Sequence, residues 1–100
     1  MNNAPDKALE LYNKGKNIIK GWKFFSSPDY SKAADFFILA GEKYKQLTIY
    51  QNSIDSFNES IGCLIKLQNN IRIAHCYIKK TDIYFLNSNM KMVYHVYKVQ

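Results

Sequence analysis

Residues 33–67, AADFFILAGEKYKQLTIYQNSIDSFNESIGCLIKL, contain the pattern that decides the fold, because aromatic and small residues recur in them at a fixed spacing. Phe37 and Phe57 are 20 residues apart, and Tyr77 continues the series. Three further series keep the same spacing: Ala34, Ile54 and Ala74; Tyr44, Leu64 and Tyr84; Ala33, Ser53 and Ile73. One helix plus its turn has this length, so two units form a hairpin slightly longer than the tetratricopeptide repeat (TPR).

Apolar residues follow the helical period throughout, and the chain has only 4 glycines and 2 prolines, so helices should dominate. The first helix is predicted to begin at Pro5 and to end before Gly21. Ser27 is the expected N-cap of the second, with Pro28 at its first position. The expected ranges are 5–19, 28–45, 50–67 and, after the Asn69-Asn70 turn, up to Leu86, where Asn87, Ser88 and Asn89 close the fourth helix.

Small residues beside the aromatic ones allow helices to approach closely, and the aromatic rings fill the remaining space. We therefore expect residues 1–86 to form an all-α, TPR-like solenoid of about four antiparallel helices, an α-α superhelix. Its interior should bury Phe37, Phe57 and Tyr77 between layers, with Ala34, Ala40 and Ala74 at the close crossings. A plain four-helix bundle is the alternative.

The tail, residues 87–100, departs from this pattern. Val93 and Tyr94 replace the small residues, and the β-branched content favours an extended segment. We expect either a truncated fifth helix or a disordered tail. Because a solenoid needs a capping element at its end, we also expect the chain to be part of a longer protein.

Composition and charge narrow the class of protein. The chain is 47% apolar, but its apolar runs are too short for a transmembrane helix, and its start does not resemble a secretory signal, so we expect a cytoplasmic protein. The net charge is +6, with an excess of lysine in the first 25 residues, which can favour anionic lipid, acidic protein or nucleic acid as a partner; solvated lysines with no partner are the alternative. Nucleic acid is not expected, since Arg72 is the single arginine.

The candidates for catalysis or metal binding do not form a site. His75 and Cys76 are adjacent on a predicted helix, so their side chains diverge. Cys63, Cys76, His75 and His95 lack the close ligand pairs of a zinc site, and the two cysteines are expected to be buried thiols. The chain also has no glycine-rich phosphate loop. We expect no enzyme, no cofactor and no metal.

Three stretches resemble the N-terminal part of the soluble NSF attachment proteins, the gamma type above all. They are WKFFSSPDYSKAADFF at 22–37, EKYKQLTIYQNSIDSF at 42–57 and IAHCYIKKTDIYF at 73–85. The resemblance implies an adaptor that wraps a syntaxin-like SNARE complex and, in the full-length protein, recruits the NSF-type ATPase that disassembles it. This role belongs to vesicle-mediated intracellular transport and membrane fusion.

The resemblance also implies a membrane-contacting loop after the first helix. Its residues are Lys20, Trp22, Lys23, Phe24 and Phe25, where apolar rings and lysines would meet an anionic membrane surface. The protein would then be cytoplasmic and peripherally membrane-associated. The alternative is that the aromatic residues fold back as a hydrophobic staple between the first two helices.

SNARE contacts in this family come from basic residues. The candidates here are Lys66, Arg72, Lys79 and Lys80, and a solvated surface is the alternative for each. A second function remains open: a small helical protein-binding module, of the microtubule-interacting-and-trafficking type or a generic TPR, that binds a partner helix.

Overall fold

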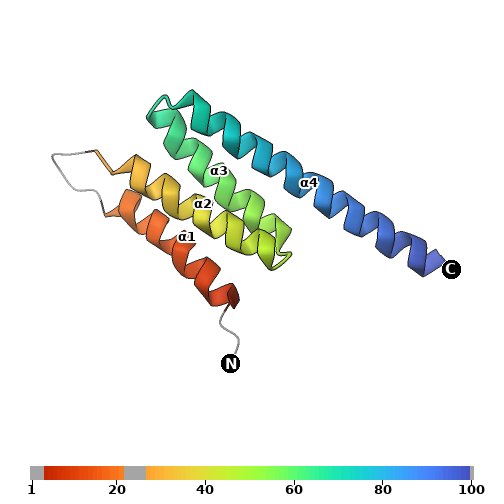
Figure 1. Ribbon diagram of the computed structural model, residues 1–100. Helices are drawn as coiled ribbons and strands as arrows, with labels where there is room; N and C mark the ends of the chain where they lie inside the picture. The colour runs from red at the N-terminus through yellow and green to blue at the C-terminus, as the bar shows by residue number, and fades with distance from the viewer. Residues whose placement is uncertain (1–3, 22–26, 100) are drawn as a thin grey trace.

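The structure, a computed structural model, describes residues 4–21 and 27–99 (Figure 1). These residues form four α-helices and no β-strand: α1 (Ala4–Lys20), α2 (Tyr30–Gln46), α3 (Tyr50–Lys66) and α4 (Asn70–Val99). Consecutive helices run antiparallel and each packs against the next along the chain (Figure 1). The predicted all-α class is confirmed. Within the described ranges, no helix combines the length and the hydrophobicity that crossing a bilayer requires.

The 20-residue period of the sequence corresponds to a structural unit. Helices α2 and α3 each have 17 residues and are each followed by a three-residue turn. Both turns place a residue other than glycine in the left-handed region, Thr48 at φ 60° and Gln68 at φ 57°. In both, the residue after it donates its backbone N–H to a carbonyl in the last turn of the helix: Ile49 N to Tyr44 O at 2.9 Å and Asn69 N to Leu64 O at 3.1 Å.

Two aromatic rings lie on glycines of the preceding helix. Phe37 of α2 packs on Gly15 of α1, and Phe57 of α3 packs on Gly41 of α2; a Cβ atom at either glycine would lie 2.8 Å from the ring. Both rings are fully buried. The helices can therefore approach closely because each glycine has no side chain, and the phenylalanine ring of the next helix fills the space above it.

Buried serines also join α3 to α2. Ser53 Oγ donates a hydrogen bond to Gly41 O at 2.6 Å, and Ser60 Oγ donates one to Ala34 O at 3.3 Å. A larger side chain at either serine would separate the helices. Both hydroxyls are satisfied by helix carbonyls, so their burial leaves no polar group without a partner.

The repeat does not continue into the packing of α4, and two predictions are wrong there. Tyr77 is 51% exposed and Ala74 is also exposed, although the spacing predicted both in the interior. Cys76 and Ile83 are the buried residues of this helix. The physical reason lies on the preceding helix: Phe37 and Phe57 each pack on a glycine there, whereas the α3 residue 20 positions after Gly41 is the buried Ile61, whose side chain leaves no gap for the Tyr77 ring.

Two predicted helix ends also differ from the structure. Helix α2 is capped by Asp29, whose carboxylate accepts a hydrogen bond from Lys32 N at 3.0 Å, and not by Ser27. Helix α4 does not end at Asn87–Asn89 but continues to Val99, past the end of α3 (Figure 1). Asparagine and serine are weak helix formers, but without glycine or proline they do not stop a helix that is already formed.

Candidate interaction surfaces

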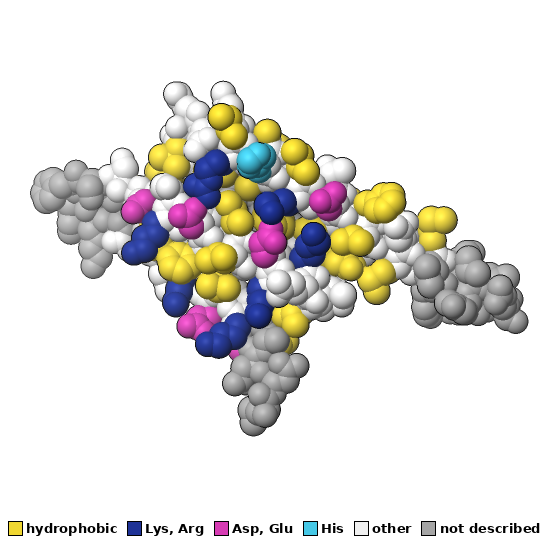
Figure 2. Space-filling model, in the orientation of Figure 1, with side chains coloured by type: hydrophobic (Ala, Val, Ile, Leu, Met, Phe, Trp, Pro, Cys, Tyr) yellow, Lys and Arg dark blue, Asp and Glu magenta, His cyan; other side chains and the backbone are white. Residues whose placement is uncertain are grey.

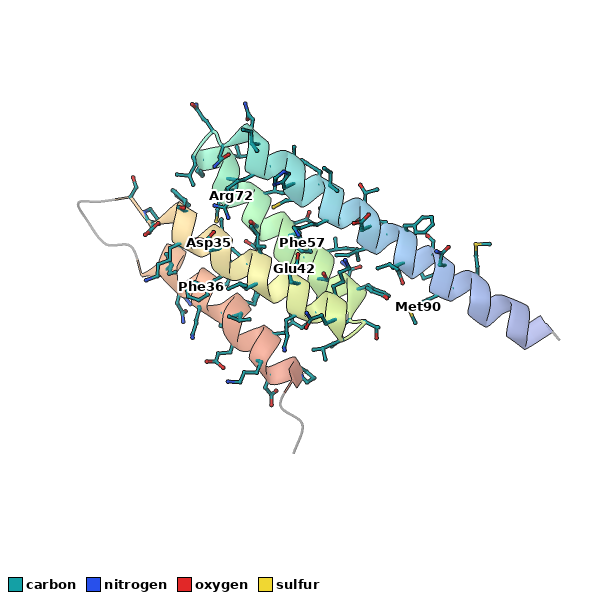
Figure 3. The ribbon with its side chains drawn as sticks, viewed as in Figure 1. Asp35, Phe36, Glu42, Phe57, Arg72 and Met90 are labelled. Carbon is teal, nitrogen blue, oxygen red and sulfur yellow. The ribbon has the colours of Figure 1, made fainter. Side chains whose placement is uncertain are left out.

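Two ion pairs connect α4 to α2 across one face of the molecule. Arg72 Nη2 lies 2.5 Å from Asp35 Oδ1, and Lys79 Nζ lies 2.6 Å from Glu42 Oε1. Figure 3 shows Arg72 close to Asp35, with Glu42 further along α2. The two acidic residues are seven positions apart on α2, and the two basic residues are seven positions apart on α4. The second ion pair therefore repeats the first about two helical turns later. We call these four residues the α2–α4 ion pairs.

The α2–α4 ion pairs are partly exposed, with side-chain exposure between 31% and 59%. Water and salt screen charges at this depth, so each pair contributes about 0–1 kcal/mol to the free energy of unfolding. They join side chains of α2 and α4, two helices that are not consecutive in the chain. In Figure 2 acidic and basic side chains alternate across this face.

The four SNARE-binding candidates occupy one end of α3 and the first half of α4. Arg72 and Lys79 are held by the acidic side chains of α2, so a partner carboxylate would have to compete with Asp35 and Glu42. Lys80 Nζ lies 5.2 Å from the centre of the Tyr77 ring, a cation–π distance. Lys66 is the last residue of α3 and is exposed. Lys66 and Lys80 therefore have no acidic partner among the described residues.

The predicted membrane loop is only partly described. Lys20 is the last residue of α1 and is exposed to solvent. Trp22, Lys23, Phe24 and Phe25 lie outside the described residues. The membrane-contacting role of this segment, and the alternative of a hydrophobic staple, both stay predictions.

A polar contact between α1 and α3 lies in a shallow groove. Tyr12 Oη donates a hydrogen bond to Glu59 Oε2 at 3.3 Å, and Lys16 Nζ lies 3.5 Å from the same oxygen. Burial, with the nearby Glu59 carboxylate, raises the pKa of Tyr12 above its usual value. The phenol therefore stays protonated and acts as a hydrogen-bond donor between the helices. The groove is lined by Tyr12, Asn13, Lys16, Asn17, Ile19, Lys20 and Glu59.

Both cysteines are buried and are not joined in a disulfide, as the sequence predicted for small apolar residues. Burial raises the pKa of the Cys63 thiol to about 11, with Glu59 adding to the rise. A thiol with this pKa is almost entirely protonated at neutral pH and is a poor nucleophile. Cys76 Sγ lies 3.7 Å from Ser60 Oγ, whereas its neighbour His75 is exposed.

The described residues do not bring metal-ligating side chains together. In the ranges 4–21 and 27–99, no group of three histidine, cysteine or acidic side chains is placed to hold a metal ion. The side chain of His95 lies outside the described part of the chain. Comparison with protein-family models, curated proteins and solved structures gives no match to this chain.

Sequence reasoning missed the α2–α4 ion pairs. The signal was present as a charge match, since the acids Asp35 and Glu42 and the bases Arg72 and Lys79 have the same spacing. Recognising it required knowing that side chains of α2 and α4 meet, which the linear repeat does not state. The exposure of Tyr77 and Ala74 on α4 was missed for another reason: the repeat predicted both residues to be buried.

Proposed function

We propose that this chain is a helical adaptor of the soluble NSF attachment protein type, which binds a SNARE complex as part of vesicle-mediated transport. The observation that carries the proposal is the repetition of one unit, a 17-residue helix with a three-residue left-handed turn and a phenylalanine packed on a glycine of the preceding helix. Stacked units of this kind support a TPR-like solenoid, a fold whose extended surface binds other proteins.

In this proposal the basic side chains of α3 and α4 meet acidic side chains on the four-helix SNARE bundle. Lys66 and Lys80 are available first, because neither is paired with a carboxylate among the described residues. Arg72 and Lys79 would join by exchanging Asp35 and Glu42 for acids of the partner. Electrostatic matching of this type contributes mainly to specificity and to the association rate.

The aromatic segment after α1 supplies the second contact, to an anionic membrane surface, and keeps the cytoplasmic adaptor at the membrane where SNAREs are anchored. Recruitment of an NSF-type ATPase is assigned to the full-length protein. We therefore expect the 100-residue chain to bind a SNARE bundle weakly and not to stimulate the ATPase by itself.

The test is calorimetric titration of an assembled SNARE four-helix bundle with the wild-type chain and the Lys66→Glu/Lys80→Glu variant. We expect binding that weakens as salt is raised, since the Debye length falls from about 10 Å at 0.1 M to about 3 Å at 1 M. The variant should lose at least about tenfold in affinity, whereas the control Lys14→Glu, on α1, should bind like the wild type.

Two outcomes would contradict the proposal. One is the absence of binding at low salt. The other is an equal loss of affinity in the Lys66→Glu/Lys80→Glu variant and in the Lys14→Glu control. Binding to a single isolated SNARE helix, with no preference for the assembled bundle, would assign the chain instead to the small helical modules that hold one partner helix.

A further inference from the structure

Helix α4 has an outer side on which large apolar residues recur every seven positions. Ile71, Ile78, Phe85 and Met92 are 73%, 60%, 65% and 66% exposed. Figure 2 shows hydrophobic side chains gathered along α4, including the part that extends past α3. Isolated exposed apolar residues are common on proteins, but a continuous row of four indicates an interaction surface.

The residues between them complete a heptad pattern. If the four large residues take position a, position d is taken by Ala74, Thr81 and Ser88, all small and all exposed. We call these seven residues the α4 stripe. The opposite side of the helix contains the buried Cys76 and Ile83, so α4 has one side in the protein core and one side available to a partner helix.

The sizes of these residues favour one orientation. In a parallel pair, position a meets position a, which would place Phe85 on Phe85 and leave layers of alanine, threonine and serine with nothing to fill them. In an antiparallel pair, position a meets position d of the other helix. Three of the four large residues then face a small one: Ile71 faces the partner's Ser88, Phe85 faces the partner's Ala74, and Ile78 faces the partner's Thr81. Met92 faces the partner's Leu67, in the turn before α4.

We propose that the α4 stripe pairs with the α4 stripe of a second copy of this chain in an antiparallel, two-fold symmetric dimer. The two-fold axis would pass beside the bond between Lys79 and Lys80, where the stripe is its own complement. A two-fold interface uses the same surface on both copies, so it closes without leaving a second copy of the stripe exposed.

Charges beside the stripe agree with this pairing. At the same register, position e of one helix meets position e of the other, which places His75 opposite the partner's Asp82 on both sides of the two-fold axis. Position g places Tyr77 opposite the partner's Tyr84. Both sets are exposed in the single chain, so they are available for contact. No like-charged side chains face one another in these rows.

The dimer requires no change in the rest of the fold. Lys79 is directed to Glu42 of α2, and Lys80 lies over the Tyr77 ring, so neither lysine has to be buried in the stripe. The hydroxyl of Thr81 donates to Tyr77 O at 2.9 Å within its own helix, so this hydroxyl keeps a partner when the stripe is covered. From Ile71 to Met92 the stripe is about 32 Å long.

The first test is sedimentation velocity of the full chain over a concentration series that extends to the millimolar range. We expect a monomer–dimer equilibrium that strengthens with salt, because screening reduces repulsion between two chains of net charge +6. Ile78→Glu/Phe85→Glu should weaken the dimer by at least about tenfold, with unchanged helix content because both residues are exposed.

The matched control is Leu39→Glu/Ile65→Glu, which places the same two charges on exposed apolar residues of α2 and α3, and it should dimerise like the wild type. A wild-type chain that stays monomeric at the highest concentration overturns the proposal. So does a dimer that Ile78→Glu/Phe85→Glu leaves intact. Capture of a separate amphipathic helix by a monomeric chain would also overturn it and would identify the other occupant of the stripe.

Orientation is tested separately. His75→Asp places a carboxylate opposite the partner's Asp82 and should weaken the dimer; adding Asp82→Lys should restore it, because the antiparallel register brings these two positions together. A spin label on Ser88→Cys should give a distance of about 26 Å between copies in the antiparallel dimer and about 10 Å in a parallel one. The shorter distance, or no restoration by Asp82→Lys, contradicts the antiparallel arrangement.

Discussion

The ring of Phe57 occupies the space that a side chain at Gly41 would need, since a Cβ atom there would lie 2.8 Å from it. Gly41→Ala should therefore force the ring or the helix to move and lower the free energy of unfolding by about 1–3 kcal/mol. Urea unfolding followed by circular dichroism measures the change.

Gly62 provides the matched control, because it also lies inside a helix, α3, but has no neighbouring atom within 4 Å of a Cβ position. Gly62→Ala should raise the free energy of unfolding by about 0.5–1 kcal/mol, since alanine is the better helix former. If both variants change stability in the same direction, the packing of Phe57 on Gly41 is not what determines the effect.

The turns after α2 and α3 contain strain that glycine would relieve. Thr48 is β-branched and has φ 60°, a region that glycine enters without a steric penalty. Thr48→Gly should raise the free energy of unfolding by up to about 1 kcal/mol, the balance of the relieved strain and the greater freedom of glycine in the unfolded chain. Thermal unfolding gives the readout, and Thr48→Val, which keeps the branching, should show no gain.

The repeat of 20 residues allowed much of the fold to be predicted, because a helix and its turn are local structures that nearby residues determine. Phe37 and Phe57 are buried as the spacing predicted. Tyr77 fits the spacing equally well and is exposed, because its burial depends on a neighbouring helix and not on its own sequence context. Periodicity identifies the side of a helix that can be buried. Whether that side is buried depends on how the neighbouring helices pack against it.

The candidate surfaces were less accessible to sequence reasoning. The basic residues Arg72 and Lys79 were found, but their acidic partners lie on α2, 37 residues earlier in the chain. Such contacts depend on how α2 and α4 are arranged around α3, which no local sequence pattern determines. The N-cap of α2 illustrates a smaller limit: Ser27 and Asp29 are both good capping residues, and the structure selects Asp29 because its carboxylate reaches Lys32 N.

The Cys63 thiol should make stability depend on pH in the alkaline range. Its pKa is raised by burial from the usual 9.0 to about 11, so the folded state holds the proton more tightly than the unfolded state. The contribution of this group is fully present below pH 9.0 and is lost as the pH rises toward about 11. Urea unfolding at increasing pH should show this decline, and Cys63→Ala should flatten it. Parallel pH profiles for the two proteins would contradict the assignment.

The segment after α1 should bind membranes through its aromatic residues. Trp22 favours the interface of a bilayer, Phe24 and Phe25 can insert below it, and Lys20 and Lys23 can each add about 1 kcal/mol of attraction to anionic headgroups. We expect the wild-type chain to co-sediment with vesicles that contain phosphatidylserine, and Phe24→Ser/Phe25→Ser to lose this binding. Ile65→Ser, which removes an exposed apolar residue from α3, serves as the control and should bind like the wild type.

The free energy of unfolding of the Phe24→Ser/Phe25→Ser variant decides between membrane contact and a hydrophobic staple. A loss of several kcal/mol in its free energy of unfolding means that the two rings seal the first helices, because removing exposed residues leaves stability almost unchanged.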